Sequence, residues 1–465
     1  MKQLASSNSI SWDTQLIKRH DLAGPRYTSY PTALQFDSSL SSINLLQQAK
    51  STLQINQPLS LYFHIPFCAH VCYYCACNKV ITAQRQRAQP YLDSLYQEMQ
   101  YMAGHYSAGR EVRQLHIGGG TPTFLSDSQL AQLMEKARQL FNLVDDQHGD
   151  FSIEIDPREC SADSLRNLRA IGFNRISIGI QDLHPQVQQA VNRVQDTGQI
   201  VQLIKQAKAE GFKSINVDLI YGLPHQSVES FSDTLAQVIE MSVDRLSVFN
   251  YAHMPDRFRP QRHIRDQDLP SPAQKLAIQQ QSIIQLTEAG YVYIGMDHFA
   301  KPDDELSLAQ ASGQLQRNFQ GYTTHADCDL VAMGVSAISK IGDLYYQNAH
   351  DLSIYTDLIE KQQQAICRGV TLTRDDKIRR DLIKELICHC YLDIDKFAAQ
   401  QQLDFSQYFA FELAQLEPLA KDGLLAVDHH SIQLTASGRL LVRRVCMIFD
   451  RYLPRQEQQK FSRII

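Results

Sequence analysis

Short apolar, β-branched segments alternate with amphipathic stretches of helical length through the middle of the chain. The strand-like segments span residues 59–64, 114–117, 151–155, 175–181, 214–221, 245–250 and 291–296. Between most of them lie helix-like stretches at residues 90–103, 126–141, 161–171, 200–210 and 227–241. Alternating strands and helices form a parallel sheet with right-handed crossovers. The pattern therefore predicts an α/β fold, a complete or a partial and open barrel, over residues 56–364.

The two ends of the chain do not share this alternation. Residues 1–55 precede the first strand and contain an extended, proline-flanked segment at residues 25–31. We expect them to form an arm that acts as a substrate lid. Further on, the segments at residues 374–390 and 405–419 are helix-like, and residues 422–435 indicate a short hairpin. The sequence thus predicts a separate C-terminal domain at residues 365–465, mainly helical and winged-helix-like.

The composition narrows the range of partners. The 465 residues carry a formal net charge of −5, which does not favour nucleic acid or an anionic membrane as the main partner. No apolar run approaches the roughly 20 residues that cross a bilayer, so we expect no membrane span. Ten cysteines are too sparse for a disulfide scaffold, and no targeting segment is apparent. We expect a cytoplasmic protein with reduced cysteines.

Four cysteines lie within ten residues. Cys68, Cys72 and Cys75 have a C-x3-C-x2-C spacing, and Cys77 follows two residues later. Thiolates this close can surround one soft metal centre, and an iron–sulfur cluster held by three of them leaves one iron open to another ligand. Zinc sites usually pair two C-x2-C knuckles, and no second knuckle follows here. The spacing favours a cluster with an open iron, and zinc or a chance spacing stay as alternatives.

Small and polar residues follow the predicted strands. In βα barrels the active site forms at the carboxyl ends of the strands, so these residues are expected to converge at one mouth. A single polar residue at such a position is as often a routine exit from a strand. The residues concerned are His64, Gly118, Gly119, Gly120, Thr121, Glu154, Asp156, Gln181, Asp182, Asp218, Tyr221, Asn250, His253, Asp297 and His298.

Several strings of sequence match those of a known family. They are PRYTSYP at residues 25–31, HIPFC at 64–68, GGGTPT at 118–123, DLIYGLP at 218–224, NYAH at 250–253 and GMDHFA at 295–300. Together with the cysteine motif, they make the chain similar to radical S-adenosylmethionine (radical SAM) enzymes. Over nearly its whole length the chain resembles the oxygen-independent coproporphyrinogen III oxidase family, which implies a barrel of the radical SAM type. Ala76 departs from the glycine that the family often has, and its methyl group is expected to crowd the loop beside Cys77.

This resemblance implies cofactors and a reaction. Cys68, Cys72 and Cys75 would bind three irons of a [4Fe-4S] cluster, and S-adenosylmethionine would occupy the fourth. Cys77 would remain unbound, close enough to assist the radical step. A 5′-deoxyadenosyl radical would take hydrogen from a substrate propionate, and loss of carbon dioxide and one electron would leave a vinyl group. Two such events convert coproporphyrinogen III to protoporphyrinogen IX in anaerobic haem biosynthesis.

The resemblance also implies roles for individual residues. The catalytic residues would be Tyr62, Glu154, Cys77, His298, Phe319 and Gln320. The first S-adenosylmethionine would contact Tyr62, Gly119, Gly120, Glu154 and Ile338. A second molecule of this cofactor would contact Tyr74, Gly120, Thr121, Gln181, Arg193, Asp218 and Ala252. Each role has a plainer alternative, such as a core tyrosine, a tight glycine turn, a surface carboxylate or an internal ion pair.

The implied substrate carries four propionates, so anion-binding side chains are expected near the site. Arginine suits carboxylates because its planar fork bonds both oxygens. The candidates are Arg26, Arg257, Arg259, Arg262, His263 and Arg265, although a solvated basic loop explains any one of them. The expected protein partner is a low-potential electron donor such as flavodoxin or ferredoxin. The sequence does not identify the electron acceptor or the oligomeric state, and a monomer is the working hypothesis.

Two other functions stay open from the sequence. A haem chaperone of the same superfamily would keep the cluster motif without decarboxylating its ligand. Another radical enzyme acting on tetrapyrroles would need a different substrate mouth. The arm, Cys77 and the full C-terminal domain favour the oxidase. Cys388 and Cys390 have no assigned role, and their C-x-C spacing in a predicted helix indicates buried or incidental cysteines.

Overall fold

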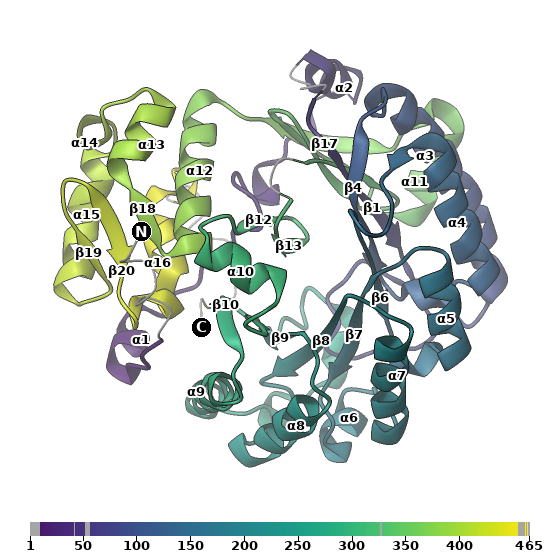
Figure 1. The fold of residues 1–465 in the computed structure, drawn as a ribbon, viewed down its shortest axis with the longest axis horizontal. Coiled ribbons are helices and arrows are strands. Elements are labelled where there is room, and N and C mark those ends of the chain that lie inside the picture. Colours follow the sequence, from purple (N-terminus) through teal and green to yellow (C-terminus); the bar gives the residue numbers. More distant parts are fainter. Residues whose placement is uncertain are drawn as a thin grey trace. The chain divides into compact units, whose positions relative to one another are not determined.

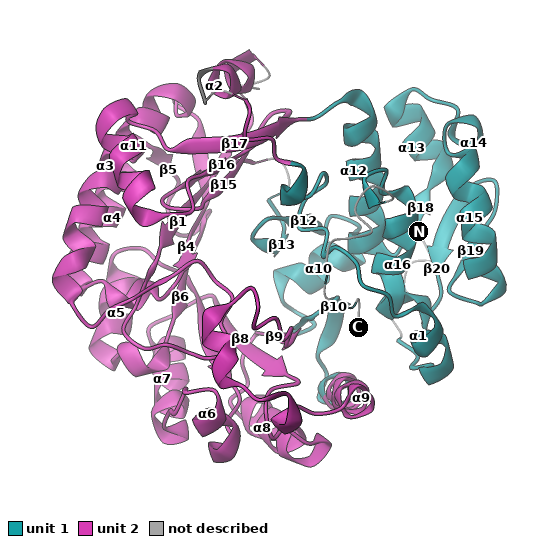
Figure 2. Cartoon of the chain, turned by 180° about the vertical axis from the view of Figure 1, so that it is seen from behind, with its two compact units in different colours: residues 1–35, 286–326, 372–465 teal, residues 36–285, 327–371 magenta. Residues whose placement is uncertain are grey.

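The computed structural model describes residues 10–40, 42–51, 56–325, 328–453, 461 and 463. The chain divides into two compact units, which Figure 2 distinguishes by colour. The sheet unit comprises residues 36–285 and 327–371. The terminal unit comprises residues 1–35, 286–326 and 372–465. Each unit therefore joins segments that are far apart in the sequence.

A single twisted sheet forms the core of the sheet unit, with its strands in the order β9-β8-β7-β6-β4-β1-β14-β15-β16-β17. The parallel strands are β1 (Leu59–Ile65), β4 (Glu111–Gly119), β6 (Asp150–Ile155), β7 (Arg175–Gln181), β8 (Ser214–Tyr221), β9 (Arg245–Asn250) and β14 (Asp329–Met333). Antiparallel pairing continues the sheet through β15 (Ile338–Ile341), β16 (Leu344–Asn348) and β17 (Ile366–Thr371). The predicted parallel sheet is confirmed. The antiparallel extension is not foreseen by the sequence pattern.

The long helices of the sheet unit run along the outer side of this sheet (Figure 1). They are α3 (Ala88–Tyr106), α4 (Asp127–Leu140), α5 (Ala162–Ala170), α7 (Thr197–Ala209), α8 (Val228–Glu240) and α11 (Leu352–Gln362). The sheet unit also contains α2 (Ser42–Ser51) and α6 (Pro185–Ala190). Helix α9 (Pro272–Glu288) begins in the sheet unit and ends in the terminal unit. Ser126 and Ser227 begin α4 and α8 with capping boxes, which satisfy amide groups that a helix start leaves unpaired.

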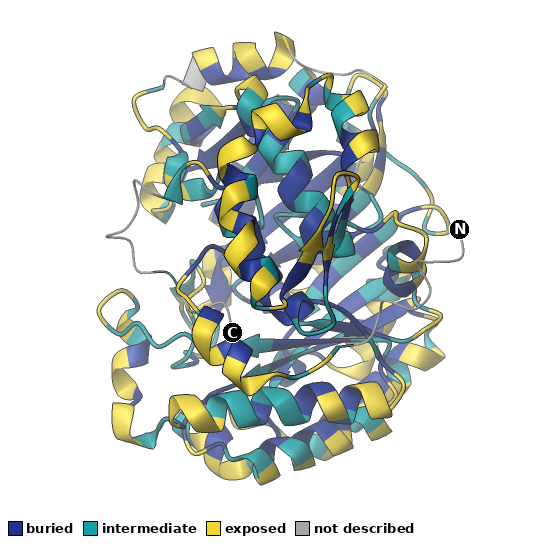
Figure 3. Ribbon diagram, turned by 90° about the vertical axis from the view of Figure 1, so that its left-hand side faces the viewer, coloured by how far each residue is buried: buried dark blue, intermediate teal, exposed yellow. Residues whose placement is uncertain are grey.

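The two faces of the parallel strands differ in burial. In β6 and β7 every second residue is buried, for example Ile153, Ile176 and Ile178. The intervening residues, such as Glu154 and Ser177, are half-buried. Because successive side chains in a strand point to opposite faces, the polar residues share one face of the sheet. Figure 3 shows the strands largely buried, while the helices expose their outer sides.

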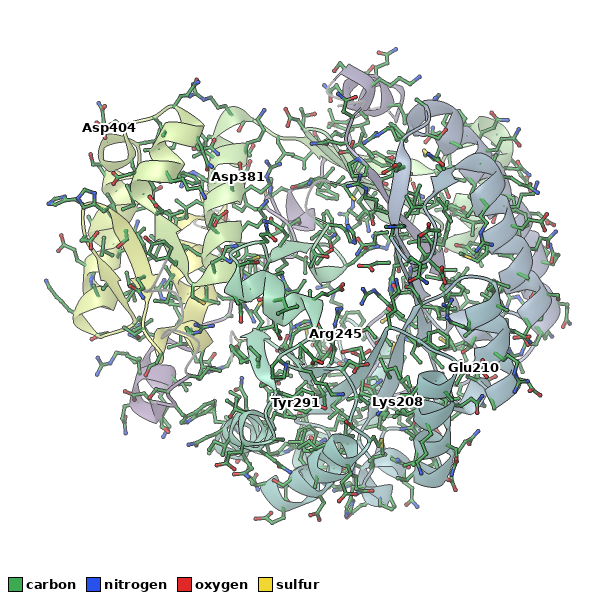
Figure 4. All side chains as sticks on the ribbon, in the orientation of Figure 1. Lys208, Glu210, Arg245, Tyr291, Asp381 and Asp404 are labelled. Atoms are coloured by element: carbon green, nitrogen blue, oxygen red, sulfur yellow. The ribbon has the colours of Figure 1, made fainter. Side chains whose placement is uncertain are left out.

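Polar contacts also join neighbouring helices at their ends. Lys208 in α7, labelled in Figure 4, donates from Nζ to the carbonyl oxygens of Met241 (2.8 Å) and Ser242 (2.9 Å), which follow α8. A cation placed beside the last carbonyls of a helix stabilises that end. The contact therefore ties α7 to the C-terminal end of α8.

The terminal unit is mainly helical, and the helical character predicted for the C-terminal region is confirmed in its residues from 372 onward. Its helices are α1 (Thr14–His20), α10 (Glu305–Ala311), α12 (Arg374–His389), α13 (Ile394–Gln401), α14 (Phe405–Tyr408), α15 (Ala410–Lys421) and α16 (Val442–Cys446). Its strands are β10 (Val292–Gly295), β11 (His298–Ala300), β12 (Gln316–Asn318), β13 (Gly321–Thr323), β18 (Tyr391–Asp393), β19 (Leu425–Val427) and β20 (Ser431–Leu434). None of the helices described in either unit has the length and apolarity needed to cross a membrane.

Four details of the terminal unit bear on the sequence predictions. The predicted hairpin is confirmed by the antiparallel pairing of β19 and β20. The segment 291–296 does not continue the parallel pattern, because β10 pairs antiparallel with β11. The helix expected at residues 405–419 is divided at Phe409, whose backbone is not helical (φ −107°, ψ 24°). Cys388 lies in an apolar core cluster with Ile294 and Leu306, as expected for a buried structural cysteine.

Candidate active site

A cavity of about 260 Å³ opens at the carboxyl ends of the parallel strands of the sheet unit. Its walls come from the loop after β1, the glycine turn after β4 and the ends of β6, β7 and β8. The sequence-predicted site residues that line it are Cys68, Cys72, Tyr74, Cys75, Cys77, Gly119, Gly120, Thr121, Glu154, Gln181, Arg193 and Asp218. The structure thus brings together side chains that lie as much as 150 residues apart in the sequence.

The first two cysteines are held by polar neighbours. Cys68 and Cys72 are buried. Burial raises the pKa of Cys68 to about 11, although the hydroxyl of Thr121, which donates to its Sγ at 3.4 Å, acts in the opposite direction. The guanidinium groups of Arg158 and Arg193 lie 3.6 and 3.5 Å from Sγ of Cys72. Hydrogen bonds and positive charge at sulfur stabilise a thiolate.

The last two cysteines of the motif interact with each other. The thiol of Cys77 hydrogen-bonds to Cys75, and this contact together with the nearby Lys79 lowers the pKa of Cys75 to about 6. The same contact raises the pKa of Cys77. Lys79 Nζ also donates to the carbonyl oxygen of Cys75 at 2.9 Å. Cys75 is therefore the thiolate of the pair, and the exposed Cys77 keeps its proton.

The chemistry of this donor set fits an iron–sulfur cluster. Cys68, Cys72 and Cys75 supply three sulfur ligands to one cavity, and thiolate sulfur is the ligand that iron–sulfur clusters require. Within the described parts of the chain, no three His, Cys, Asp or Glu side chains surround a position for a single metal ion. Ligands of a four-iron cluster bind separate irons and need not converge on one point.

A glycine turn forms the adjoining wall. Gly119 has φ +121°, and a Cβ at this position would lie 2.7 Å from the imidazole of His64. A Cβ on Gly120 would lie 2.7 Å from the carbonyl oxygen of Pro66. Glycine is required here because only it tolerates both the dihedral angle and the close packing. The turn leaves the Gly119 amide free to donate to Oε2 of Glu154 at 3.2 Å.

Glu154 is the acidic group of this wall. Its Oε1 lies 3.4 Å from Nε2 of His116, whose Nδ1 contacts the hydroxyl of Ser152 at 2.6 Å. Burial raises the pKa of Glu154, but His116 and the Gly119 amide outweigh burial and hold the pKa below its ordinary value. Glu154 is therefore an ionised, fixed acceptor at neutral pH, with 43% of its side chain exposed toward the cavity.

Tyr62 and His64 support this wall from β1. Burial lowers the pKa of His64, so its ring is neutral. Its Nε2 lies 3.1 Å from the carbonyl oxygen of Asn78, which can only accept, and Nε2 therefore carries the proton. Nδ1 then accepts from the hydroxyl of Tyr62 at 3.0 Å. The Tyr62 ring also stacks on His116, with ring centres 5.8 Å apart.

Asp156, Arg158 and Arg193 form an ion cluster that also lines the cavity. Asp156 Oδ2 accepts from Arg158 at 2.6 Å and from Arg193 at 2.9 Å. Burial raises the pKa of Asp156, but the two arginines outweigh it and lower the pKa to about 2. Arg193 also donates to the carbonyl oxygen of Gly179. The sequence pointed to Asp156 only as a strand end and missed Arg158, which carries no motif of its own.

Asp218 has neutral partners instead of an arginine. It accepts hydrogen bonds from the hydroxyl of Ser177 (2.8 Å) and from the side-chain amide of Asn216 (2.8 Å). Burial raises its pKa. The internal ion pair that the sequence left open for Arg193 thus involves Asp156, and Asp218 faces the cavity without a cation bonded to it in the described contacts.

Some sequence-predicted residues do not line the cavity. Ile338 begins β15, and the carbonyl oxygen of Ala252 accepts from Gln261 at 3.2 Å. His298, Phe319 and Gln320 belong to the terminal unit. The basic candidates are largely engaged elsewhere. Arg26 pairs with Asp297, Arg265 with Asp268 at 2.7 Å, and Arg262 donates to the carbonyl oxygen of Pro255 at 3.1 Å.

A parallel sheet whose carboxyl ends carry a three-cysteine loop, a glycine turn and a fixed carboxylate defines a radical SAM protein. In agreement, residues 62–238 match the Radical SAM superfamily model and residues 372–441 match the HemN C-terminal domain model. The chain belongs to the family of oxygen-independent coproporphyrinogen III oxidases. Membership implies a [4Fe-4S] cluster and S-adenosylmethionine as cofactors.

Two relatives and one solved structure show this membership. The chain is 53% identical to the oxygen-independent coproporphyrinogen III oxidase of Pseudomonas aeruginosa, a match covering 98% of this chain and 100% of the relative. It is also 53% identical to the enzyme of Escherichia coli, over 99% of this chain and 100% of the relative. The solved structure of the Escherichia coli coproporphyrinogen III oxidase superposes with a TM-score of 0.91, covering 96% of this chain and 100% of that chain.

Proposed function

We propose that the chain catalyses the anaerobic oxidative decarboxylation of two propionate groups of coproporphyrinogen III to vinyl groups. The product is protoporphyrinogen IX, an intermediate of haem biosynthesis. The observation that carries the proposal is the cavity in which Cys68, Cys72, Cys75, the glycine turn and Glu154 meet, in a chain that family members match over nearly its whole length. Such coverage favours the oxidase over a haem chaperone or another tetrapyrrole enzyme.

Cys68, Cys72 and Cys75 would hold the cluster. When bound, the cluster and S-adenosylmethionine together supply the 5′-deoxyadenosyl radical that removes hydrogen from a propionate. Thr121, Arg158 and the other groups around the sulfurs stabilise the thiolates and fix the loop. Cys77, which is exposed and protonated beside Cys75, would be left unbound and assist the radical step.

The walls of the cavity would bind two molecules of S-adenosylmethionine. Glu154 is ionised and suits hydroxyl or ammonium donors of the first molecule, against the backbone that the glycine turn exposes. Tyr62, Gly119, Gly120 and Ile338 would complete that site. The second molecule would contact Tyr74, Gly120, Thr121, Gln181, Arg193, Asp218 and Ala252, with Arg193 and Asp218 as its charged contacts.

The substrate would engage three side chains between residues 298 and 320 as well as the N-terminal arm. His298, Phe319 and Gln320 would lie at the macrocycle, and residues 1–55 would close over it as a lid. Residues 56–364 and 365–465 would form the barrel and the C-terminal domain. Each decarboxylation releases one hydrogen atom, carbon dioxide and one electron, so an electron acceptor is needed besides a low-potential donor such as flavodoxin or ferredoxin. A monomeric, cytoplasmic enzyme is proposed.

An anaerobic product assay tests the proposal. Protein reconstituted with iron and sulfide is given reductant, S-adenosylmethionine and coproporphyrinogen III, and products are separated by chromatography. We expect an intermediate with three carboxyl groups, then protoporphyrinogen IX, and no product from the Cys68→Ser control. Tight haem binding and transfer without any vinyl product would overturn the proposal and favour a haem chaperone.

A further inference from the structure

Arg317, in the terminal unit, is a half-buried arginine. It lies on β12 of the β12–β13 hairpin, and its guanidinium carbon sits 4.7 Å from the centre of the Tyr322 ring. Within the described residues, Nε and Nη1 of Arg317 are buried without a hydrogen-bond partner. A guanidinium group withdrawn from water is costly unless an anion or acceptors satisfy its N–H donors. The ring offers cation–π attraction but no acceptor oxygen.

The electrostatic surroundings of Arg317 are positive. Burial lowers the pKa of Arg443 to about 10, and the positive charges of Arg26 and Arg317 contribute to this shift. Arg26 and Arg317 are therefore each close enough to Arg443 to repel its guanidinium group. Asp297, which also acts on Arg443, is itself paired with Arg26. Arg443 donates to the carbonyl oxygens of Gly24 (2.7 Å) and Pro25 (3.0 Å) in the arm.

The same hairpin presents further unsatisfied polar atoms. Both side-chain amide atoms of Gln320 and Oε1 of Gln316 are buried without a hydrogen-bond partner in the part of the chain described. Buried polar atoms are nearly always hydrogen-bonded in a complete structure. In the same unit Arg379 pairs with Glu412 at 2.7 Å and Arg451 pairs with Asp375 at 2.5 Å. The hairpin, by contrast, gathers the unpaired donors of Arg317 with the unpaired amide atoms of two glutamines.

We infer that Arg317 binds a propionate carboxylate of the substrate through its guanidinium N–H groups. This inference rests on the proposed function, which supplies a ligand with four carboxylates. Nε and Nη1 lie on two different edges of the planar guanidinium, and each edge, completed by Nη2, can bond both oxygens of one carboxylate and fix its direction of approach. Arg317 is thus a specificity-determining residue. The amide of Gln320 would hydrogen-bond to the same bound group.

Steady-state kinetics of Arg317→Met and Arg317→Lys holoenzymes test the inference. Methionine keeps much of the apolar stem over Tyr322 and removes the charge, whereas lysine keeps the charge and loses the fork. After matching the cluster absorbance to wild type, we expect the KM for coproporphyrinogen III to rise about 10- to 100-fold in the methionine variant. The lysine variant should be intermediate, and the KM for S-adenosylmethionine should be unchanged in both. Arg374→Met, which replaces an exposed arginine of α12, is the matched control.

A binding measurement separates this inference from the proposed function. Holoenzyme is titrated with coproporphyrin III and with its tetramethyl ester, using porphyrin fluorescence. Wild type should prefer the tetra-acid by about tenfold or more, and Arg317→Met should lose most of this preference. An unchanged preference and unchanged KM in both variants would overturn the inference even if wild type decarboxylates the substrate. A rise confined to the KM for S-adenosylmethionine would also overturn it, because Arg317 would then bind the carboxylate of that cofactor.

Discussion

Glu98 is a buried acidic residue whose loss should weaken the support of the cysteine loop. It lies in α3 and is 0% exposed. It accepts hydrogen bonds from the Tyr355 hydroxyl (2.7 Å), the Gly334 amide (2.8 Å) and the Asn348 side-chain amide (2.6 Å). Tyr355 lies in α11, Gly334 in the turn after β14, and Asn348 at the end of β16. One side chain thus joins four segments of the sheet unit.

This network leads to the exit of β1. Tyr91, about two helical turns before Glu98 in α3, donates from its hydroxyl to the carbonyl oxygen of His64 at 2.5 Å. The amide of Val335, next to Gly334, donates to the same hydroxyl at 3.2 Å. A Cβ on Gly334 would lie 2.5 Å from that hydroxyl, so the turn is packed tightly against it. The carbonyl of His64 comes four residues before Cys68, and its position sets where the cluster loop begins.

We predict that Glu98→Ala lowers the free energy of unfolding by about 3–5 kcal/mol. Each buried donor left unpaired costs about 1–3 kcal/mol, and three donors lose their acceptor in this variant. Water entering the vacated space recovers part of that sum. Since about 1 kcal/mol corresponds to roughly 2–4 °C in Tm for a domain of 150–250 residues, the melting temperature should fall by roughly 10 °C. Cluster occupancy after reconstitution should fall as well.

Calorimetry at pH 6 on the full chain checks this prediction, with cluster absorbance per chain as the second readout. The control is Glu135→Ala, which removes an exposed carboxylate of α4 in the same unit. We expect its melting temperature and its cluster content to stay close to those of wild type. A decrease of less than about 1 kcal/mol in the free energy of unfolding of Glu98→Ala would refute the reasoning, because three unpaired buried donors should destabilise the fold by more than that.

Two further predictions concern the cysteines and pH. Replacing Cys68, Cys72 or Cys75 by serine should abolish the cluster absorbance, whereas Cys77→Ser should retain it, and loss of the cluster in the Cys77 variant would show a different ligand set. Burial raises the pKa of Glu98 to about 7, outweighing its three hydrogen bonds. The native state then keeps a proton that the unfolded state loses near its ordinary pKa of about 4.3, so stability should fall by up to about 3 kcal/mol as pH rises from about 4.5 to 7. Urea unfolding across this window should show no such slope in Glu98→Gln, and parallel curves for the two proteins would contradict the assignment.

The parallel half of the sheet is the part of the fold that the sequence predicts best. Strands such as Arg175–Gln181 are bounded by polar exits and separated by helical stretches, and this local pattern suffices to place them. The antiparallel strands were not predicted, because β15 and β16 are short, follow each other through tight turns and do not alternate with helices. β14 joins β1 although 263 residues lie between the end of one and the start of the other, and only three-dimensional packing determines such a pairing.

The proposed cluster ligands could be picked out because the cysteines lie within eight residues of one another, so that spacing alone indicates shared chemistry. Residues that act through distant partners were not found. Arg158 reaches Asp156 and Cys72, and Arg317 is marked only by the absence of hydrogen-bond partners within the described residues. Neither has a sequence motif, because an isolated arginine is usually a solvated surface group.

The sequence by itself determined the class of fold and the family, and it indicated the three thiols proposed as cluster ligands, since these depend on local periodicity and on motifs of adjacent residues. The tertiary structure alone decided how the charges are distributed. It pairs Arg193 with Asp156, leaves Glu154 ionised against the Gly119 amide, and buries Glu98 among three donors. The physical reason is that pKa values and ion pairs depend on burial and on neighbours brought together from separate strands, which no stretch of sequence specifies.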